Sequence, residues 1–245
     1  MPGFCGERQN PAMMTLDEKR GYVRRFFSAT GDSYDQIVSL CTFGVDRRWK
    51  RTIIERLDGP GRVLDLACGT GILSFAIARR YPACQVVGVD ITADYLRRAR
   101  EKLGGSGGSR LRFQEGWAEE FESDEPFDCI VSSYLAKYAD LSRLVPKSSS
   151  MLKPGGLLLF HDFTYPKSPL LASVWELYFK LLQSVGGRFY PNWREVFFEL
   201  PELIRRTSWV EDLMGLMRES GLVSIGAEAL TLQGATLVSA RKSRP

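Results

Sequence analysis

The sequence lacks any long apolar run of the kind that forms a membrane-spanning helix. No stretch approaches the ~18 consecutive apolar residues of such a helix, and the N-terminus has no continuous apolar core of a secretory signal. The five cysteines are scattered, odd in number and free of C-x-x-C spacing, which argues against a disulfide framework and a zinc site. We therefore expect a cytoplasmic protein with no bound metal and with buried thiols. The cysteines are Cys5, Cys41, Cys68, Cys84 and Cys129.

Strong charge of one sign is also missing. The formal net charge is +4, so composition does not indicate a nucleic-acid partner. One dense basic cluster, Arg47–Arg51, interrupts this balance. It has two interpretations, the solvated side of a helix or a contact with anionic lipid head groups or with a cofactor carboxylate.

The 245 residues fit one α/β domain with a substantial core. The most informative stretch is Val63–Gly71, a short apolar run followed by a glycine turn and a helical pattern from Ile72. This order predicts a strand, a tight loop and a helix, with a ligand site at the carboxyl end of the strand. Gly69 and Gly71 lack the Cβ atoms that would block the approach of a ligand to the backbone.

A second predicted strand, Val86–Val89, ends in Asp90, where an acid can accept hydrogen bonds from both hydroxyls of a ribose. A cofactor that contains a nucleoside is therefore predicted. Ser74 stands where a dinucleotide fingerprint has its third glycine, and Asp65 would repel a pyrophosphate but suit a cationic amino group. A site of the NAD type and a glycine turn without a ligand remain as alternatives.

The rest of the chain shows the alternation of strand and helix patterns that is typical of a doubly wound sheet. A helix is predicted over Ala93–Leu103, and further strands are predicted later in the chain, the last two as a closing antiparallel pair. A turn is predicted at 152–156, before the fifth strand. The predicted strands are 111–113, 127–133, 157–160, 223–227 and 236–240.

The acid, the glycine loop and the second acid together resemble motif I of the class I S-adenosylmethionine (SAM) methyltransferases. Four stretches more specifically resemble the UbiE/MenG family of C-methyltransferases, which methylate the quinone ring in ubiquinone and menaquinone biosynthesis. These stretches are Tyr34-Asp35 with 42–50, Val63–Gly71, 127–133 with the later Leu-Lys-Pro-Gly-Gly, and 168–187 with Trp193.

This resemblance implies a Rossmann-like sheet of seven strands with helices on both faces. It also implies an N-terminal helical lid at about 1–58, a SAM-binding core at about 59–162, a helical acceptor cover at about 163–220 and closing strands at about 221–245. SAM is the implied cofactor. The residues implied to bind it are Tyr34, Asp65, Ala67, Gly69, Thr70, Gly71, Asp90, Ile91, Trp117, Ala118 and Ser133.

Several positions differ from the family pattern. The family has Asn-Ala where this chain has Trp117-Ala118, and Trp117 either stacks on adenine or covers the pocket. The family has F-G-[LIV]-R-N where this chain has Tyr-Leu-Ala-Lys-Tyr over 134–138, and its motif histidine is replaced by Asp46. Lysine keeps the charge of the arginine but loses its planar fork. These differences leave the SAM site intact and open the acceptor to aromatic compounds other than a quinol.

Methylation of a ring carbon of a phenol or quinol requires a base that removes the hydroxyl proton. Candidates near the strand ends are Tyr134, Lys137, Tyr138, His161 and Asp162, and His161 is the only histidine in the chain. Neighbouring residues of a strand face opposite ways, so at most one of His161 and Asp162 should point into the cleft. The family has an acid at the second of these positions, which favours Asp162.

The segment 170–185 carries apolar and aromatic residues at helical spacing, among them Trp175, Phe179 and Leu182. Such a stripe indicates either ordinary core or an apolar wall for a polyprenyl tail, which Phe189, Tyr190, Trp193, Phe197 and Phe198 would extend. A substrate with such a tail partitions into the bilayer, so peripheral contact of the protein with the membrane would follow.

Three functions are therefore consistent with the sequence. The first is a SAM-dependent methyltransferase that acts on a carbon of a prenylated quinol. The second is a methyltransferase for another aromatic or secondary-metabolite acceptor, by O-, N- or C-transfer. The third is a non-catalytic SAM-binding protein. A homodimer is one option for the oligomeric state.

Overall fold

The computed structural model describes residues 20–244 except 22, 25–26, 28–29 and 105–109. Its centre is a seven-stranded sheet in the order β3-β2-β1-β4-β5-β7-β6. The strands from β3 to β5 are parallel, and β7 pairs antiparallel with both β5 and β6. The predicted Rossmann-like class and the closing antiparallel pair are thus confirmed. The strands are β1 (Arg62–Leu66), β2 (Gln85–Asp90), β3 (Leu111–Glu115), β4 (Phe127–Ser133), β5 (Leu152–Phe163), β6 (Leu222–Leu230) and β7 (Ala235–Lys242).

Helices cover both faces of the sheet because each strand buries alternate side chains on opposite sides. On one face, Leu64, Ile130 and Leu158 pack in a cluster that includes residues of α6 (Leu141–Met151) and α10 (Trp209–Glu219). On the other face, Val63 and Val131 pack in a cluster with residues of α3 (Val45–Glu55) and α4 (Ile72–Arg80). Helix α5 (Ala93–Leu103) packs on β2 and β3.

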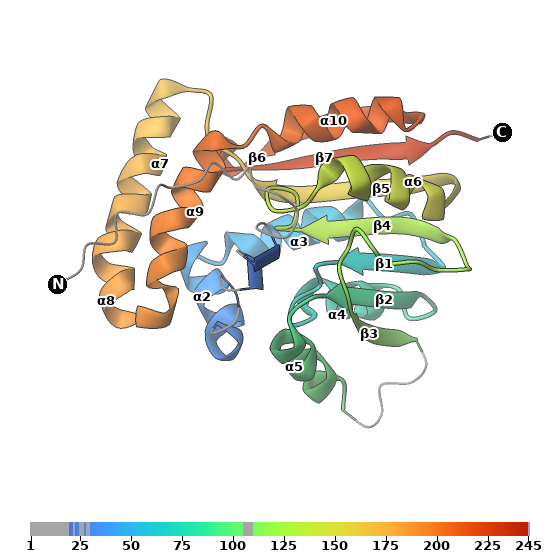
Figure 1. Ribbon diagram of the computed structural model, residues 1–245, viewed down its shortest axis with the longest axis horizontal. Coiled ribbons are helices and arrows are strands. Elements are labelled where there is room, and N and C mark those ends of the chain that lie inside the picture. The colour runs from blue at the N-terminus through green and yellow to red at the C-terminus, as the bar shows by residue number, and fades with distance from the viewer. Residues whose placement is uncertain (1–19, 22, 25–26, 28–29, 105–109, 245) are drawn as a thin grey trace.

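A helical cap lies beyond the carboxyl ends of the central strands (Figure 1). It consists of η2 (Gly31–Ser33) and α2 (Tyr34–Cys41) together with α7 (Pro169–Leu181), the π-helical η3 (Leu182–Gly186), α8 (Gly187–Phe189), η4 (Pro191–Trp193) and α9 (Arg194–Arg206). Two clusters hold these helices together, one of them around Ile37 and Trp193 and the other around Trp175 and Ile204. The cap and the sheet therefore enclose the strand ends from two sides.

Some segments are placed differently from the sequence-based expectation. The turn predicted at 152–156 lies inside β5, where Gly155 has a φ of 78° and the pairing with β4 is irregular between Leu152 and Leu157. Helix α10 falls in the stretch predicted as acceptor cover, yet Trp209, Leu213 and Met217 bury it on the sheet. Residues 1–19 of the predicted lid, and Cys5 with them, lie outside the described residues.

The four described cysteines are free, and all but Cys41 are buried. Among the helices described, none combines the length and the apolar character that crossing a bilayer requires.

Candidate functional site

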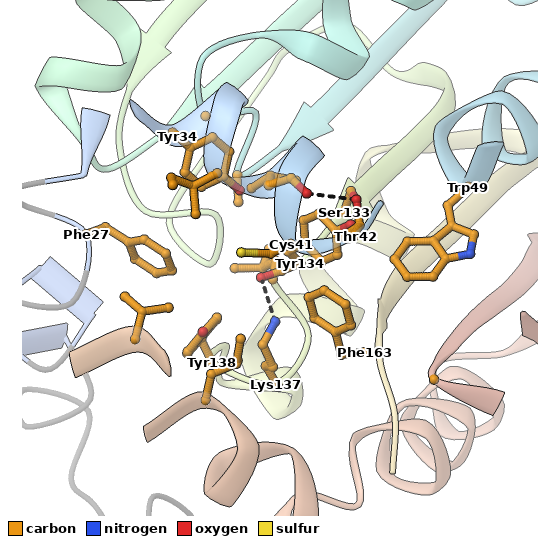
Figure 2. Close-up of a pocket in the computed structure, with 18 of the residues that line it drawn as sticks. Phe27, Tyr34, Cys41, Thr42, Trp49, Ser133, Tyr134, Lys137, Tyr138 and Phe163 are labelled. Carbon is orange, nitrogen blue, oxygen red and sulfur yellow. Dashed lines mark hydrogen bonds between the residues drawn. The ribbon is translucent and has the colours of Figure 1, made fainter. Parts of the chain in front are cut away.

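A cavity of about 400 Å³ lies between the strand ends and the cap (Figure 2). Its lining is mostly apolar and aromatic, with a few polar groups from the ends of β2 and β4. One end is lined by the loop after β1 and by Asp90, and the other by the inner faces of α7 and α9. The space is therefore continuous from the predicted cofactor end to the predicted acceptor end.

The loop after β1 lies at the predicted cofactor end of the cavity. Ala67 and Gly69 line the cavity, and both have a φ of 56°. Gly71, with φ of 82°, has a different role from the one predicted, since a Cβ there would lie 2.8 Å from Phe75 and 2.9 Å from Phe113. The absence of a side chain at Gly71 permits close packing of two rings and does not clear space for a ligand.

Asp90 ends β2 at the cavity wall. Its Oδ2 accepts a hydrogen bond from the Gly69 amide at 2.8 Å, and its Oδ1 accepts one from the Thr92 amide at 2.8 Å. Burial raises the pKa of this carboxyl, and the backbone donors oppose that effect. A carboxylate has about four acceptor positions, so Asp90 can still accept hydrogen bonds from the hydroxyls of a ribose. The other predicted cofactor residues that line the cavity are Tyr34, Ile91, Trp117, Ala118 and Ser133.

Asp65 and Thr70 are not among the residues that line the cavity. Asp65 is 1% exposed and accepts a hydrogen bond from Ser74 Oγ at 2.5 Å, and burial raises its pKa to about 7. Thr70 donates to Asp35 of α2, which also pairs with Lys102 Nζ at 2.5 Å. The Thr70 contact therefore joins the cap to the glycine loop.

Tyr134 lines the cavity on its predicted acceptor side. It has a φ of 73°, and its ring stacks on Phe163 with centroids 4.9 Å apart and an interplanar angle of 18°. Its hydroxyl donates to Asp46 Oδ1 at 2.6 Å, and Asp46 forms an ion pair with Lys50. In the sequence, Asp46 stands out only as a departure from a motif, because nothing local indicates a partner 88 positions away.

Lys137 lines the cavity beside Tyr134, and its ammonium forms an ion pair with Asp162. Figure 2 shows the side chains of Tyr134, Lys137 and Phe163 gathered in one region of the wall. The Lys137 ammonium lies 4.4 Å from the centroid of the Tyr138 ring. Burial lowers the pKa of Lys137, although the Asp162 charge opposes this. Tyr138 also lines the cavity, whereas Asp162 lies behind the wall.

His161 and Asp162 are both fully buried, and neither lines the cavity. The expectation that Asp162 points into the pocket is therefore wrong; β5 lies inside the sheet with both faces covered, so both side chains are enclosed by protein. His161 Nδ1 lies 3.0 Å from Ser133 Oγ, and Nε2 has no hydrogen-bond partner among the described residues. Burial and the nearby Lys50 and Lys137 hold the pKa of His161 well below its usual range.

The aromatic segment divides between two surfaces. Trp175, Phe179 and Leu182 line the cavity, as do Trp193 and Phe197. Phe189 and Phe198 are instead 70% and 48% exposed, and neither they nor Tyr190 are among the lining residues, which corrects their predicted place in the wall. A helix can present only one face to the cavity, so the apolar residues on its other face remain outside.

The basic cluster 47–51 likewise has an exposed side and a buried side. Arg47, Arg48 and Arg51 are exposed on α3, whereas Trp49 and Lys50 are buried. Trp49 lines the cavity and donates from Nε1 to Thr231 Oγ1 at 2.9 Å. The three arginines thus form the solvated side of the helix, and the other two residues belong to the site.

Comparisons with known proteins agree with this geometry. The model described as the ubiE/COQ5 methyltransferase family matches residues 13–242. The ubiquinone/menaquinone biosynthesis C-methyltransferase UbiE of Syntrophotalea carbinolica is 31% identical over 237 residues, which cover 95% of this chain and 99% of that protein. The demethylmenaquinone methyltransferase of Deinococcus radiodurans is 31% identical over 216 residues, which cover 86% and 89% of the two chains.

Solved structures share the fold at lower identity. Magnesium protoporphyrin IX methyltransferase of Synechocystis, with bound SAH, matches with a TM-score of 0.62 and 16% identity, covering 92% of this chain and 100% of that chain. Phosphoethanolamine N-methyltransferase 2 of Haemonchus contortus, in complex with SAM, matches with a TM-score of 0.61 and 18% identity, covering 80% of this chain and 53% of that chain. These likenesses show the fold alone.

Proposed function

The chain belongs to the ubiE/COQ5 methyltransferase family and is a SAM-dependent methyltransferase, and from this premise we propose that its acceptor is a prenylated quinol, methylated on a ring carbon. The observation that carries the proposal is the continuity of one apolar cavity from Asp90 to Trp175 and Phe179. A ring placed beside the cofactor end would leave its tail against the aromatic inner face of α7. The relatives named for menaquinone and ubiquinone biosynthesis support the same class of acceptor.

The residues at the cofactor end fit SAM. Asp90 would hold the ribose, and Ala67 and Gly69 present backbone without bulky side chains to the cavity. Trp117 and Ala118 would flank the adenine. When bound, SAM supplies an electrophilic methyl group that is already activated for transfer.

The protein's own contribution is to enclose and orient the acceptor. The rings of Tyr134, Tyr138 and Phe163 line the cavity and offer apolar contact to an aromatic ring. Holding the reacting ring in a fixed position accounts for a large part of catalysis when the donor is already reactive. Each CH₂ of a tail that is buried against α7 contributes about 0.8 kcal/mol to binding.

The test is transfer from radiolabelled SAM to a prenylated naphthoquinol that lacks the ring methyl group. The same ring without the tail and a set of simple phenols are offered in parallel. We expect the tailed quinol to have the highest kcat/KM, with the label on a ring carbon. Faster transfer to an unrelated phenol, or label on an oxygen, would favour the second function, which the replacements at Lys137 and Tyr138 support.

We also propose peripheral contact with a lipid surface through the outer face of α7. Leu170, Leu177 and Leu181 recur at helical spacing, are between 57% and 74% exposed and do not line the cavity. Exposed Lys180 adds a positive charge to this helix. An exposed apolar stripe of this kind is typical of a surface that meets a membrane or a partner.

Co-flotation with vesicles of phosphatidylglycerol and phosphatidylethanolamine tests the contact. Leu177→Glu should reduce the bound fraction, and Val223→Glu, at a valine of β6 that is 47% exposed, serves as the matched control. Equal binding of the two variants would contradict the assignment of this face.

A further inference from the structure

The structure brings a buried carboxylate, a buried lysine and a cavity-lining tyrosine into one chain of contacts. We propose that Tyr134 accepts the hydroxyl proton of the acceptor while it passes its own proton to Asp46, so that the acceptor ring becomes nucleophilic. Tyr134 is then the catalytic residue of the proton transfer, and Asp46 positions Tyr134 and takes its proton. The inference rests on the proposed function in one respect, that the acceptor carries an ionisable hydroxyl.

The geometry holds the tyrosine in one orientation. Tyr134 follows the last residue of β4 with a φ of 73°, and its amide donates to the His161 carbonyl at 2.8 Å. The stack on Phe163 fixes the plane of the ring, and the hydrogen bond to Asp46 Oδ1 at 2.6 Å fixes the direction of the hydroxyl proton. A positive φ is unusual for a residue with a side chain and persists only where the surroundings impose it.

The direction of the hydrogen bond sets the direction of the relay. Because Tyr134 Oη donates to Asp46, its lone pairs are left to accept a proton from a ligand in the cavity. Burial and the Asp46 charge raise the pKa of Tyr134 well above its usual range, so the side chain is a phenol before the acceptor arrives. It can therefore relay a proton but does not carry a stored negative charge.

The surrounding charges make Asp46 the carboxylate that serves this tyrosine. Asp162 is engaged by Lys137, through its ammonium and through its backbone amide at 3.2 Å. Asp46 is paired with Lys50, whose ammonium also lies 4.9 Å from the centroid of the Tyr134 ring. Lys50 remains beside the carboxyl after it is protonated and can then stabilise the negative charge that moves to the acceptor oxygen.

The step is balanced in atoms and electrons. The O–H bond of the acceptor breaks, its proton forms a bond to Tyr134 Oη, and its electron pair stays on the acceptor oxygen. The original O–H bond of Tyr134 breaks as its proton bonds to Asp46 Oδ1. The net result is a neutral Asp46, a neutral Tyr134 and an acceptor oxyanion.

Both members of the relay differ from the family pattern described above. Tyr134 stands where that pattern has phenylalanine, and Asp46 stands where it has histidine. The two replacements lie 88 positions apart in the chain, yet they contact each other. A matched pair of replacements, with Tyr134 lining the cavity and Asp46 buried behind it, supports a shared role in this chain.

The experiment compares acceptors that differ in the acidity of their hydroxyl. One is a prenylated naphthoquinol, and the other is its polyfluorinated counterpart, whose hydroxyl is largely ionised at the assay pH. The variants are Tyr134→Phe and Asp46→Asn. Tyr81→Phe is the matched control, because Tyr81 also donates its hydroxyl to carbonyls at the end of α3, those of Ile54 and Leu57, but does not line the cavity.

With the un-ionised quinol, both variants should lose roughly 10²–10⁴-fold in kcat/KM, the usual contribution of general base catalysis. With the fluorinated acceptor, the loss should shrink to a few-fold, because no proton has to be removed. The affinity for SAM, measured by calorimetry, should stay within about twofold of wild type. Tyr81→Phe should show the same ratio between the two acceptors as wild type.

Equal losses on both acceptors would overturn the relay and leave Tyr134 as packing. A Tyr81→Phe variant that behaves like Tyr134→Phe would overturn it as well. If the wild type methylates only phenols, the proposed quinol fails, and the same comparison is made with a phenol and its fluorinated counterpart. Transfer to no hydroxyl-bearing acceptor at all would overturn both proposals.

Discussion

Replacing Asp65 by asparagine should make the protein more stable at alkaline pH. Asp65 lies in β1 at 1% exposure, and burial raises the pKa of its carboxyl from the ordinary 3.8 to about 7, although Ser74 and Lys50 act in the opposite direction. A carboxyl whose pKa is raised by folding stabilises the native state below its unfolded pKa. That contribution is lost as the pH rises through the folded value.

The size of the effect follows from the two pKa values. The difference between 3.8 and about 7 corresponds to about 4 kcal/mol at about 1.36 kcal/mol for each pH unit. Asparagine has nearly the same shape and does not ionise, so it carries no such penalty. The stability of Asp65→Asn relative to wild type should therefore increase by about 4 kcal/mol between about pH 4 and about pH 8.

Urea unfolding followed by circular dichroism, repeated across this pH range, measures the difference. Asp58→Asn is the control, because Asp58 is an exposed aspartate and its replacement removes the same charge outside the buried strand. A stability difference between Asp65→Asn and wild type that does not change with pH would refute the reasoning. It would mean that Asp65 is ionised in the folded protein at neutral pH.

Three further predictions concern the cofactor end, the acceptor wall and the glycine loop. Asp90→Ala should weaken SAM binding by roughly 1.5–3 kcal/mol, the range for hydrogen bonds to a charged group. Calorimetric titration measures this loss, and an unchanged affinity would contradict the prediction. Phe179→Ser should lower the ratio of kcat/KM for long-tailed over short-tailed quinols, whereas Leu177→Ser on the outer face should leave that ratio at the wild-type value. Gly71→Ala should lower the free energy of unfolding by about 1–3 kcal/mol through its φ of 82° and the clash with Phe75, a loss that thermal unfolding measures.

Local patterns were sufficient to predict several elements correctly. The helix predicted at Ala93–Leu103 and the strand predicted over 127–133 have the bounds of α5 and β4. Both depend on interactions between near neighbours, such as the helical repeat and the apolar run. β5 is longer than the predicted strand, because the turn signal at Pro154 and Gly155 forms an irregularity inside the strand and does not end it.

The arrangement of the acceptor wall could not be read in the same way. Alternation along a strand predicts that His161 and Asp162 face opposite sides, but it does not tell which of these sides is covered. Because β5 lies between β4 and β7 with helices on both faces, both residues are buried. Similarly, nothing near Phe189 in the sequence distinguishes the exposed face of the cap from the face that lines the cavity.

The fold class and the place of the ligand site can be predicted from the sequence, because a glycine loop between a strand and a helix, followed by an acid after the next strand, is a local arrangement typical of a site for a nucleoside-containing cofactor. Which charged groups meet at the cavity depends instead on the tertiary structure. Asp46 reaches Tyr134, and Lys137 reaches Asp162, only because α3 and the ends of β4 and β5 converge on one cavity. Contacts between distant segments depend on how the whole sheet and its cap pack together, and that information is not present in any short stretch of the chain.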